Sequence, residues 1–69
     1  MSDFSFEIVE HIGKLGQESN GWQKELNRVS YGGRSPKYDI RAWDPDHQKM
    51  TKGITLSQEE FDDLKALLG

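Results

Sequence analysis

The sequence KYDIRAWDPD (residues 37–46) alternates as a β-strand does and then ends in a turn. Successive side chains of a strand point to opposite faces, so Tyr38, Ile40 and Ala42 share one face. We predict that this apolar face is the core side of the strand. The other face is predicted to meet solvent, and it carries Lys37, Asp39, Arg41 and Trp43. A solvent-facing tryptophan beside two cations calls for a functional explanation, because the chain has a net charge of −3.

The end of the chain, LSQEEFDDLKALLG, carries the clearest helix signal. Ser57 and Glu60 have the spacing of a capping box, which satisfies amide groups at the start of a helix. Gly69 is typical of the position just after a helix. The predicted helix has one apolar stripe, which consists of Phe61, Leu64, Leu67 and Leu68. Such a stripe must cover another apolar surface, and a sheet is the surface that the sequence provides.

Three further segments are predicted to be strands. The first begins with Phe4, Phe6 and Ile8 on one face. The adjacent pair Ile8-Val9 interrupts this alternation, which predicts a bulge, a strong twist or burial on both faces at this point. The second is ambiguous, since part of it has helical spacing, but its aromatic residues and flanking glycines favour a strand. The predicted boundaries are residues 4–15, 22–31, 37–43 and 50–56 for the strands and 16–21 for a loop. The fold class is therefore α+β, with four strands followed by one C-terminal helix (ββββα).

The length of 69 residues has room for one domain, predicted to span residues 1–69. A core of this size is marginal, and the absence of cysteine excludes disulfides, so we expect a homodimer. No segment approaches the ~20 apolar residues of a membrane span, so no membrane partner is expected. The N-terminal pattern is not that of a signal peptide, which predicts a cytoplasmic protein.

The charges are unevenly distributed along the chain. Residues 1–10 and 57–69 together have a net charge of −6, whereas residues 11–56 have a net charge of +3. A basic middle segment can steer an anionic partner to one surface. Ordinary solvated charge is the alternative interpretation, and the charge pattern alone does not decide between the two.

No catalytic constellation is present, so we predict that the protein is not an enzyme and has no cofactor. A nucleophilic serine or threonine needs a histidine with an orienting partner, and neither His11 nor His47 lies in such a motif. Asp44, Asp46 and His47 suggest a metal site, but Asp-Pro-Asp is far more typical of a turn. We therefore predict no metal site.

A mixture of aromatic and basic residues is the remaining signal. Unpaired bases stack on aromatic rings, and lysine and arginine neutralise backbone phosphates, so this mixture favours single-stranded nucleic acid. Both tryptophans could instead belong to the core, and for Trp22 the two alternatives are evenly balanced. The predicted nucleic-acid-binding residues are Trp22, Lys24, Arg28, Tyr31, Arg34, Lys37, Arg41, Trp43 and Lys52.

The segments YDIRAW and KGITLSQEEFDDLKALL, separated by a turn, resemble the DNA-binding domain of the positive cofactor four family of transcriptional coactivators. Together with FEIVEHIGKL and GWQKELN, the whole chain is most similar to the small bacterial YdbC-like branch. The resemblance implies an antiparallel sheet and a homodimer built largely by the helices. It further implies that single-stranded DNA lies in channels formed by the sheets. We expect Phe61, Leu64, Leu67 and Leu68 at the dimer interface.

The resemblance also implies roles for individual residues. Arg41 corresponds to a phosphate contact, Trp43 to a base-stacking aromatic, and Tyr31 to a second stacking aromatic. Arg34 matches a basic turn residue and Lys24 a basic strand residue. Lys24 and Tyr31 differ in strand parity, so a bulge or twist is predicted between them if both face DNA.

The predicted function is sequence-tolerant binding of single-stranded DNA in transcription or DNA maintenance, with a nucleoid association if the protein is bacterial. Two alternatives stay open. The first is an RNA-binding module, because stacking and phosphate contacts do not distinguish ribose from deoxyribose. The second is a protein-interaction module that uses exposed tryptophans.

Overall fold

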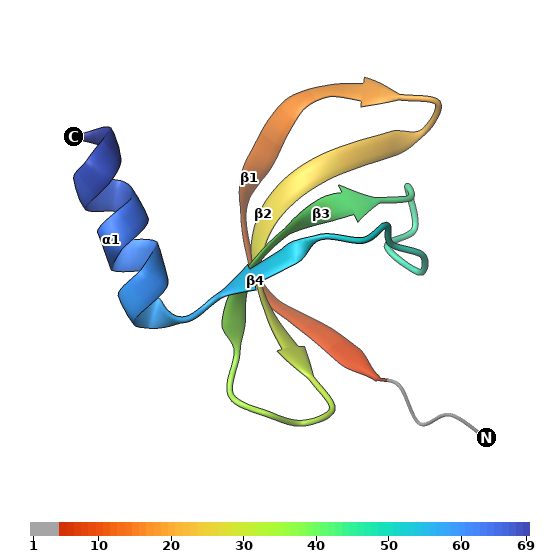
Figure 1. Ribbon diagram of the computed structural model, residues 1–69. Helices are drawn as coiled ribbons and strands as arrows, with labels where there is room; N and C mark the ends of the chain where they lie inside the picture. Colours follow the sequence, from red (N-terminus) through yellow and green to blue (C-terminus); the bar gives the residue numbers. More distant parts are fainter. Residues whose placement is uncertain (1–4) are drawn as a thin grey trace.

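Figure 1 shows the computed structural model, which describes residues 5–69 as one curved sheet followed by a helix. The strands form a single antiparallel sheet in the order β1-β2-β3-β4. The predicted fold class is confirmed, and Phe4 lies outside the described residues. The elements are β1 (Phe6–Ser19), β2 (Trp22–Tyr31), β3 (Lys37–Trp43), β4 (Ile54–Leu56) and α1 (Gln58–Leu68).

The pairing of β1 with β2 is irregular at three places, the last of which lies between Leu15 and Ser19. Of the alternatives predicted at Ile8-Val9, the structure shows the bulge. The register against β2 shifts by one residue at Val9 and again at Ile12. Each extra residue changes the phase of the alternation. As a result, Ile8, His11 and Lys14 line the same hollow of the sheet although they are spaced at intervals of three residues.

Strand β1 is also longer than predicted. It continues through residues 16–19, which the sequence indicated as a loop, so that part of the prediction is wrong. The chain reverses at Asn20 and Gly21, whose φ angles are 53° and 83°. Left-handed backbone is readily adopted by asparagine and glycine, so these two residues alone provide the tight turn.

Strand β4 is shorter than predicted, because only Ile54–Leu56 are paired continuously with β3. Met50 forms an isolated bridge to Trp43, and between the two paired regions the chain passes closely over β3 at Gly53. A Cβ atom at Gly53 would collide with the Ile40 carbonyl oxygen and with Arg41. The glycine is therefore required by close approach of two backbones.

The predicted core side of β3 is wrong. Asp39 and Trp43 are fully buried, whereas Tyr38, Ile40 and Ala42 are half-buried. The sheet is strongly curved, as Figure 1 shows, and Phe6 from β1 and His47 from the turn after β3 pack against the Trp43 ring. We call the side of the sheet that bears Asp39 and Trp43 the inner face, and the side that bears Tyr38 and Ile40 the outer face.

Helix α1 begins with the predicted capping box and ends at Gly69 as predicted. The Ser57 amide donates to the Glu60 carboxylate, and the Glu60 amide donates to the Ser57 hydroxyl. The Phe61 ring stacks on Tyr38 of the outer face, with centroids 3.8 Å apart. The helix then leaves the sheet, and Leu67 is 83% exposed. Within residues 5–69, no helix is long and apolar enough to cross a membrane.

Candidate nucleic-acid interface

The predicted nucleic-acid-binding residues are divided between the two faces of the sheet. Strand β2 pairs with β3 without interruption from Gln23 to Val29, and with β1 without interruption from Val29 to Tyr31. No bulge of β2 therefore lies between Lys24 and Tyr31, and strict alternation places the two residues on opposite faces. The outer face bears Trp22, Lys24 and Arg28, and the inner face bears Tyr31, Lys37, Arg41 and Trp43.

On the outer face the basic residues lie among acidic and aromatic neighbours. Arg28 is 3.5 Å from the Glu10 carboxylate, and its guanidinium lies 5.8 Å from the centroid of the Tyr38 ring. Lys24 is exposed and Trp22 is half-buried. These residues share the face of the sheet that α1 touches through Phe61.

Trp43 is fully buried, so the prediction that it faces solvent is wrong, whereas its predicted role as a base-stacking aromatic stays a prediction. Its ring packs against Phe6 at a centroid distance of 5.2 Å and against His47 at 5.7 Å. The curl of the sheet brings Phe6 over it from β1, and the turn after β3 brings His47. The indole Nε1 is buried and has no hydrogen-bond partner among the described residues.

Arg41 forms an ion pair inside the inner face. Its Nε donates to the Asp39 carboxylate over 2.7 Å, and the Arg41 side chain is only 14% exposed. The guanidinium also lies 5.4 Å from the centroid of the Tyr31 ring. Because Asp39 is fully buried, Arg41 is needed to neutralise it. The family resemblance implied that Arg41 contacts a phosphate, and that contact stays a prediction; in this arrangement the arginine is engaged with Asp39.

The Tyr31 hydroxyl completes this network by donating to the second oxygen of Asp39 over 2.9 Å. Burial, together with the hydrogen bond to Asp39, raises the pKa of the Tyr31 hydroxyl well above its usual range. The phenol therefore stays protonated, and Tyr31 stays anchored at its polar end.

A groove of about 200 Å³ opens on the inner face where β2 turns into β3. Arg34 and Lys37 are exposed at this groove, and Tyr31 is half-buried beside them. The turn is held by the Arg34 amide, which donates to the Tyr31 carbonyl over 3.1 Å. The lining residues are Val29, Tyr31, Arg34, Ser35, Lys37 and Thr55, none of which is acidic. The structure thus brings three of the predicted binding residues together, while Lys52 is exposed in the segment before β4.

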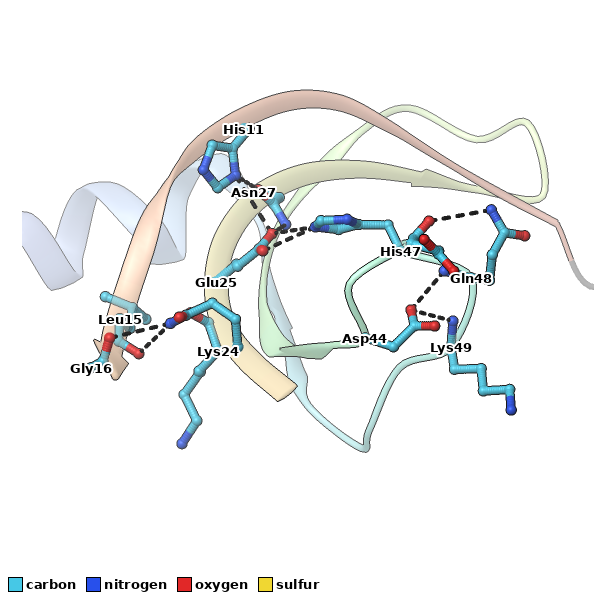
Figure 2. A network of polar contacts seen from close by, with 12 residues as sticks. His11, Leu15, Gly16, Lys24, Glu25, Asn27, Asp44, His47, Gln48 and Lys49 are labelled. Atoms are coloured by element: carbon cyan, nitrogen blue, oxygen red, sulfur yellow. Dashed lines mark hydrogen bonds and ion pairs between the residues drawn. The ribbon is translucent and has the colours of Figure 1, made fainter. Parts of the chain in front are cut away.

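A second hollow, of about 300 Å³, contains residues that the sequence prediction missed. Glu25 is 3% exposed and accepts hydrogen bonds from His47 Nε2 over 2.9 Å and from Asn27 Nδ2 over 3.0 Å, as Figure 2 shows. His11 Nδ1 lies 2.7 Å from Asn27 Oδ1 and 3.5 Å from the Glu25 carboxylate. The two histidines, far apart in sequence, therefore meet at one buried carboxylate.

The turn after β3 positions His47 in this hollow. The Asp44 carboxylate accepts from the amides of Gln48 and Lys49 over 2.8 and 3.0 Å, so the predicted Asp-Pro-Asp turn is confirmed. These hydrogen bonds, that of Lys49 above all, lower the pKa of Asp44. His47 itself has a φ angle of 56°, a left-handed conformation that is uncommon for a residue with a side chain.

Comparison with known proteins agrees with the fold and with the sequence resemblance. The family described as Transcriptional Coactivator p15 (PC4) matches residues 19–67 of this chain. An uncharacterized protein of Treponema pallidum (strain Nichols) is 48% identical over 66 residues, which cover 96% of this chain and 78% of that protein.

Proposed function

The chain belongs to the Transcriptional Coactivator p15 (PC4) family, which is known for binding single-stranded DNA, and on this premise we propose that it is a homodimeric, sequence-tolerant single-stranded DNA-binding protein. The proposal involves no catalytic step. It places the activity in transcription or DNA maintenance, in the cytoplasm as the sequence predicted. RNA binding is the alternative outcome of the experiment described below.

The groove formed by Tyr31, Arg34 and Lys37 is the observation that supports this proposal most directly. An aromatic ring in the same groove as two exposed cations offers an unpaired base a surface to stack on and offers the flanking phosphates their counter-charges. The Tyr31 ring cannot swing away freely, since its hydroxyl is bonded to Asp39. We therefore assign stacking with an unpaired base to Tyr31 and phosphate contacts to Arg34 and Lys37.

The homodimer is supported by apolar surface that one chain leaves uncovered. A groove of about 340 Å³ between α1 and the outer face is lined mainly by apolar side chains, and Leu67 and Leu68 project beyond it with 83% and 80% exposure. The fully buried apolar side chains within residues 5–69 are Val29 and Trp43 alone. A second copy that covers the helix stripe would supply the core that one chain lacks.

Binding of oligo-dT and the matching oligo-U, measured by fluorescence anisotropy at two salt concentrations, tests the proposal. We expect oligo-dT to bind with a strong salt dependence, because phosphate contacts release counterions. Arg34→Ala and Lys37→Ala should each weaken binding equally for all sequences and reduce the salt slope by about one.

Lys24→Ala is the matched control, since Lys24 is an exposed cation on the opposite face of the sheet. We expect it to leave the salt slope close to that of the parent. An equal loss of oligo-dT affinity in Lys24→Ala and Arg34→Ala would contradict the assignment of the groove as the DNA-binding site. Tighter binding of oligo-U than of oligo-dT would favour the RNA alternative, and the absence of binding to either would reject the function.

A further inference from the structure

His47 holds a position in the second hollow that a nucleobase could hold. Its flat ring lies against the Trp43 ring at a centroid distance of 5.7 Å with an interplanar angle of 31°. On the edge of the ring, the His47 Nε2 atom donates to both carboxylate oxygens of Glu25, over 2.9 and 3.1 Å. Stacking on an aromatic ring and donating from a ring edge are the two contacts by which proteins bind unpaired bases.

The surroundings of His47 also allow a ligand to displace its side chain from the second hollow. Its side chain is 40% exposed, whereas Glu25 and Trp43 beneath it are buried. His47 belongs to a short surface turn in left-handed backbone, a conformation that costs free energy for a residue with a side chain. Displacing the ring would uncover the face of Trp43 without breaking a strand pairing, since the turn lies between β3 and β4.

We propose that this hollow is a second base-binding site, and that its ligand is an unpaired guanine in single-stranded DNA, which displaces His47. The inference rests on the proposed function and adds a base preference to it. The guanine would stack on Trp43 and donate to Glu25, and His47 occupies the site when no guanine is bound.

Guanine fits the chemistry of Glu25 better than the other bases. An ionised carboxylate only accepts hydrogen bonds, and it accepts two parallel ones best. The Watson–Crick edge of guanine offers two adjacent donors, N1–H and the 2-amino group, whereas adenine, cytosine and thymine each offer one donor group on that edge. Asn27 Nδ2 already donates to Glu25, which fixes the orientation of the carboxylate.

The rim of the hollow supplies a counter-charge for the backbone of the bound strand. Lys14 lines the hollow and is exposed, and it lies opposite Glu25 in the register of β1 and β2. A phosphate flanking the guanine would meet this ammonium group. The hollow of about 300 Å³ is within the size range of small-molecule sites, so one base can be accommodated.

The test compares two thymidine 12-mers that carry one central guanine or one central hypoxanthine. The two bases differ only in the 2-amino group, so a difference in affinity reports the second hydrogen bond to Glu25. We expect the parent protein to prefer guanine. His47→Gly, which suits the left-handed backbone, empties the site and should raise the preference to about tenfold, the value of one hydrogen bond to a charged group. Glu25→Gln should abolish it.

Gln48→Ala, in the same turn but exposed, is the control and should keep the preference of the parent. Thermal unfolding of each variant and binding to plain oligo-dT show whether it is folded. Equal affinity for the two 12-mers in both the parent and His47→Gly would overturn the guanine site while leaving the proposed function intact. A preference that survives in folded Glu25→Gln would also overturn it. If no oligonucleotide binds the parent protein, both the guanine site and the proposed function are rejected.

Discussion

A fully buried carboxylate such as Asp39 is stable only where neighbouring groups compensate its charge. Arg41 and Tyr31 do so together, one by an ion pair and the other by a hydrogen bond. The arginine of the IRAW segment therefore contributes to folding. The nearby cations Arg34 and Lys37 are exposed and are not paired with a buried carboxylate within residues 5–69, so they remain available to a ligand.

Arg41→Ala is expected to destabilise the protein by about 3–5 kcal/mol, because it leaves the Asp39 charge buried without a partner. A loss of this size is a large part of the total stability of a small domain. Urea unfolding followed by tryptophan fluorescence measures it. Arg34→Ala provides the comparison and should unfold within about 0.5 kcal/mol of the parent, as exposed substitutions do. Similar unfolding curves for the two variants would contradict the structural role of Arg41.

At the scale of the elements, the segment before β4 passes closely over β3. This crossing brings together the two most distinctive parts of the sequence, the KGITL and IRAW segments. The KGITL segment contains the glycine that approaches Arg41 of the IRAW segment. Thr51 adds to this crossing, since its amide donates to the Ala42 carbonyl over 3.0 Å and its hydroxyl accepts from the Ala42 amide over 3.1 Å. The two segments therefore form one packing unit.

Gly53→Ala should destabilise the fold, because its methyl group would force β3 and the crossing segment apart. Overpacking of this kind typically costs about 1–3 kcal/mol. Gly13→Ala is the matched control: it lies in a strand, and nothing approaches within 4 Å of its would-be Cβ. We expect the melting temperature to fall for Gly53→Ala only. An unchanged melting temperature for Gly53→Ala would contradict this prediction, because it would show that β3 and the crossing segment can move apart without loss of stability.

The strands, the irregularity at Ile8-Val9 and the capped helix could be predicted because their signals are local. Alternation and capping residues act within a few positions of one another. The identity of the inner face could not be predicted, since it depends on the curl of the whole sheet. The meeting of His11, Glu25 and His47 also escaped prediction, because strand register and the turn after β3 bring them together from three separate segments.

The molecule as a whole buries polar as well as apolar side chains on its inner face and has an apolar groove on its outer side. Glu25, Asn27 and Asp39 are buried on the inner face, while Ile54, Leu67 and Leu68 are exposed on the other side. Polar networks cost free energy to bury and contribute less than apolar contacts do. The folded chain is thus expected to depend on association through the outer side.

Leu67→Ser should shift the protein from dimer to monomer, because Leu67 is 83% exposed in one chain and gains burial only from a partner. Sedimentation equilibrium at micromolar concentration measures the shift. Asp62→Asn, on the same helix, is the control and should remain a dimer. A parent protein with monomer mass under these conditions would reject the dimer itself.

The bulges of β1 at Val9 and Ile12 have a consequence for the behaviour of the protein at high concentration. β1 is an edge strand, and a long, flat edge would be a template for uncontrolled sheet extension between molecules. The bulges at Val9 and Ile12 break the regular spacing of its amide and carbonyl groups, and Glu10 and Lys14 add charge along it. β1 is therefore protected against aggregation by the same irregularities that shape the hollow on its inner face.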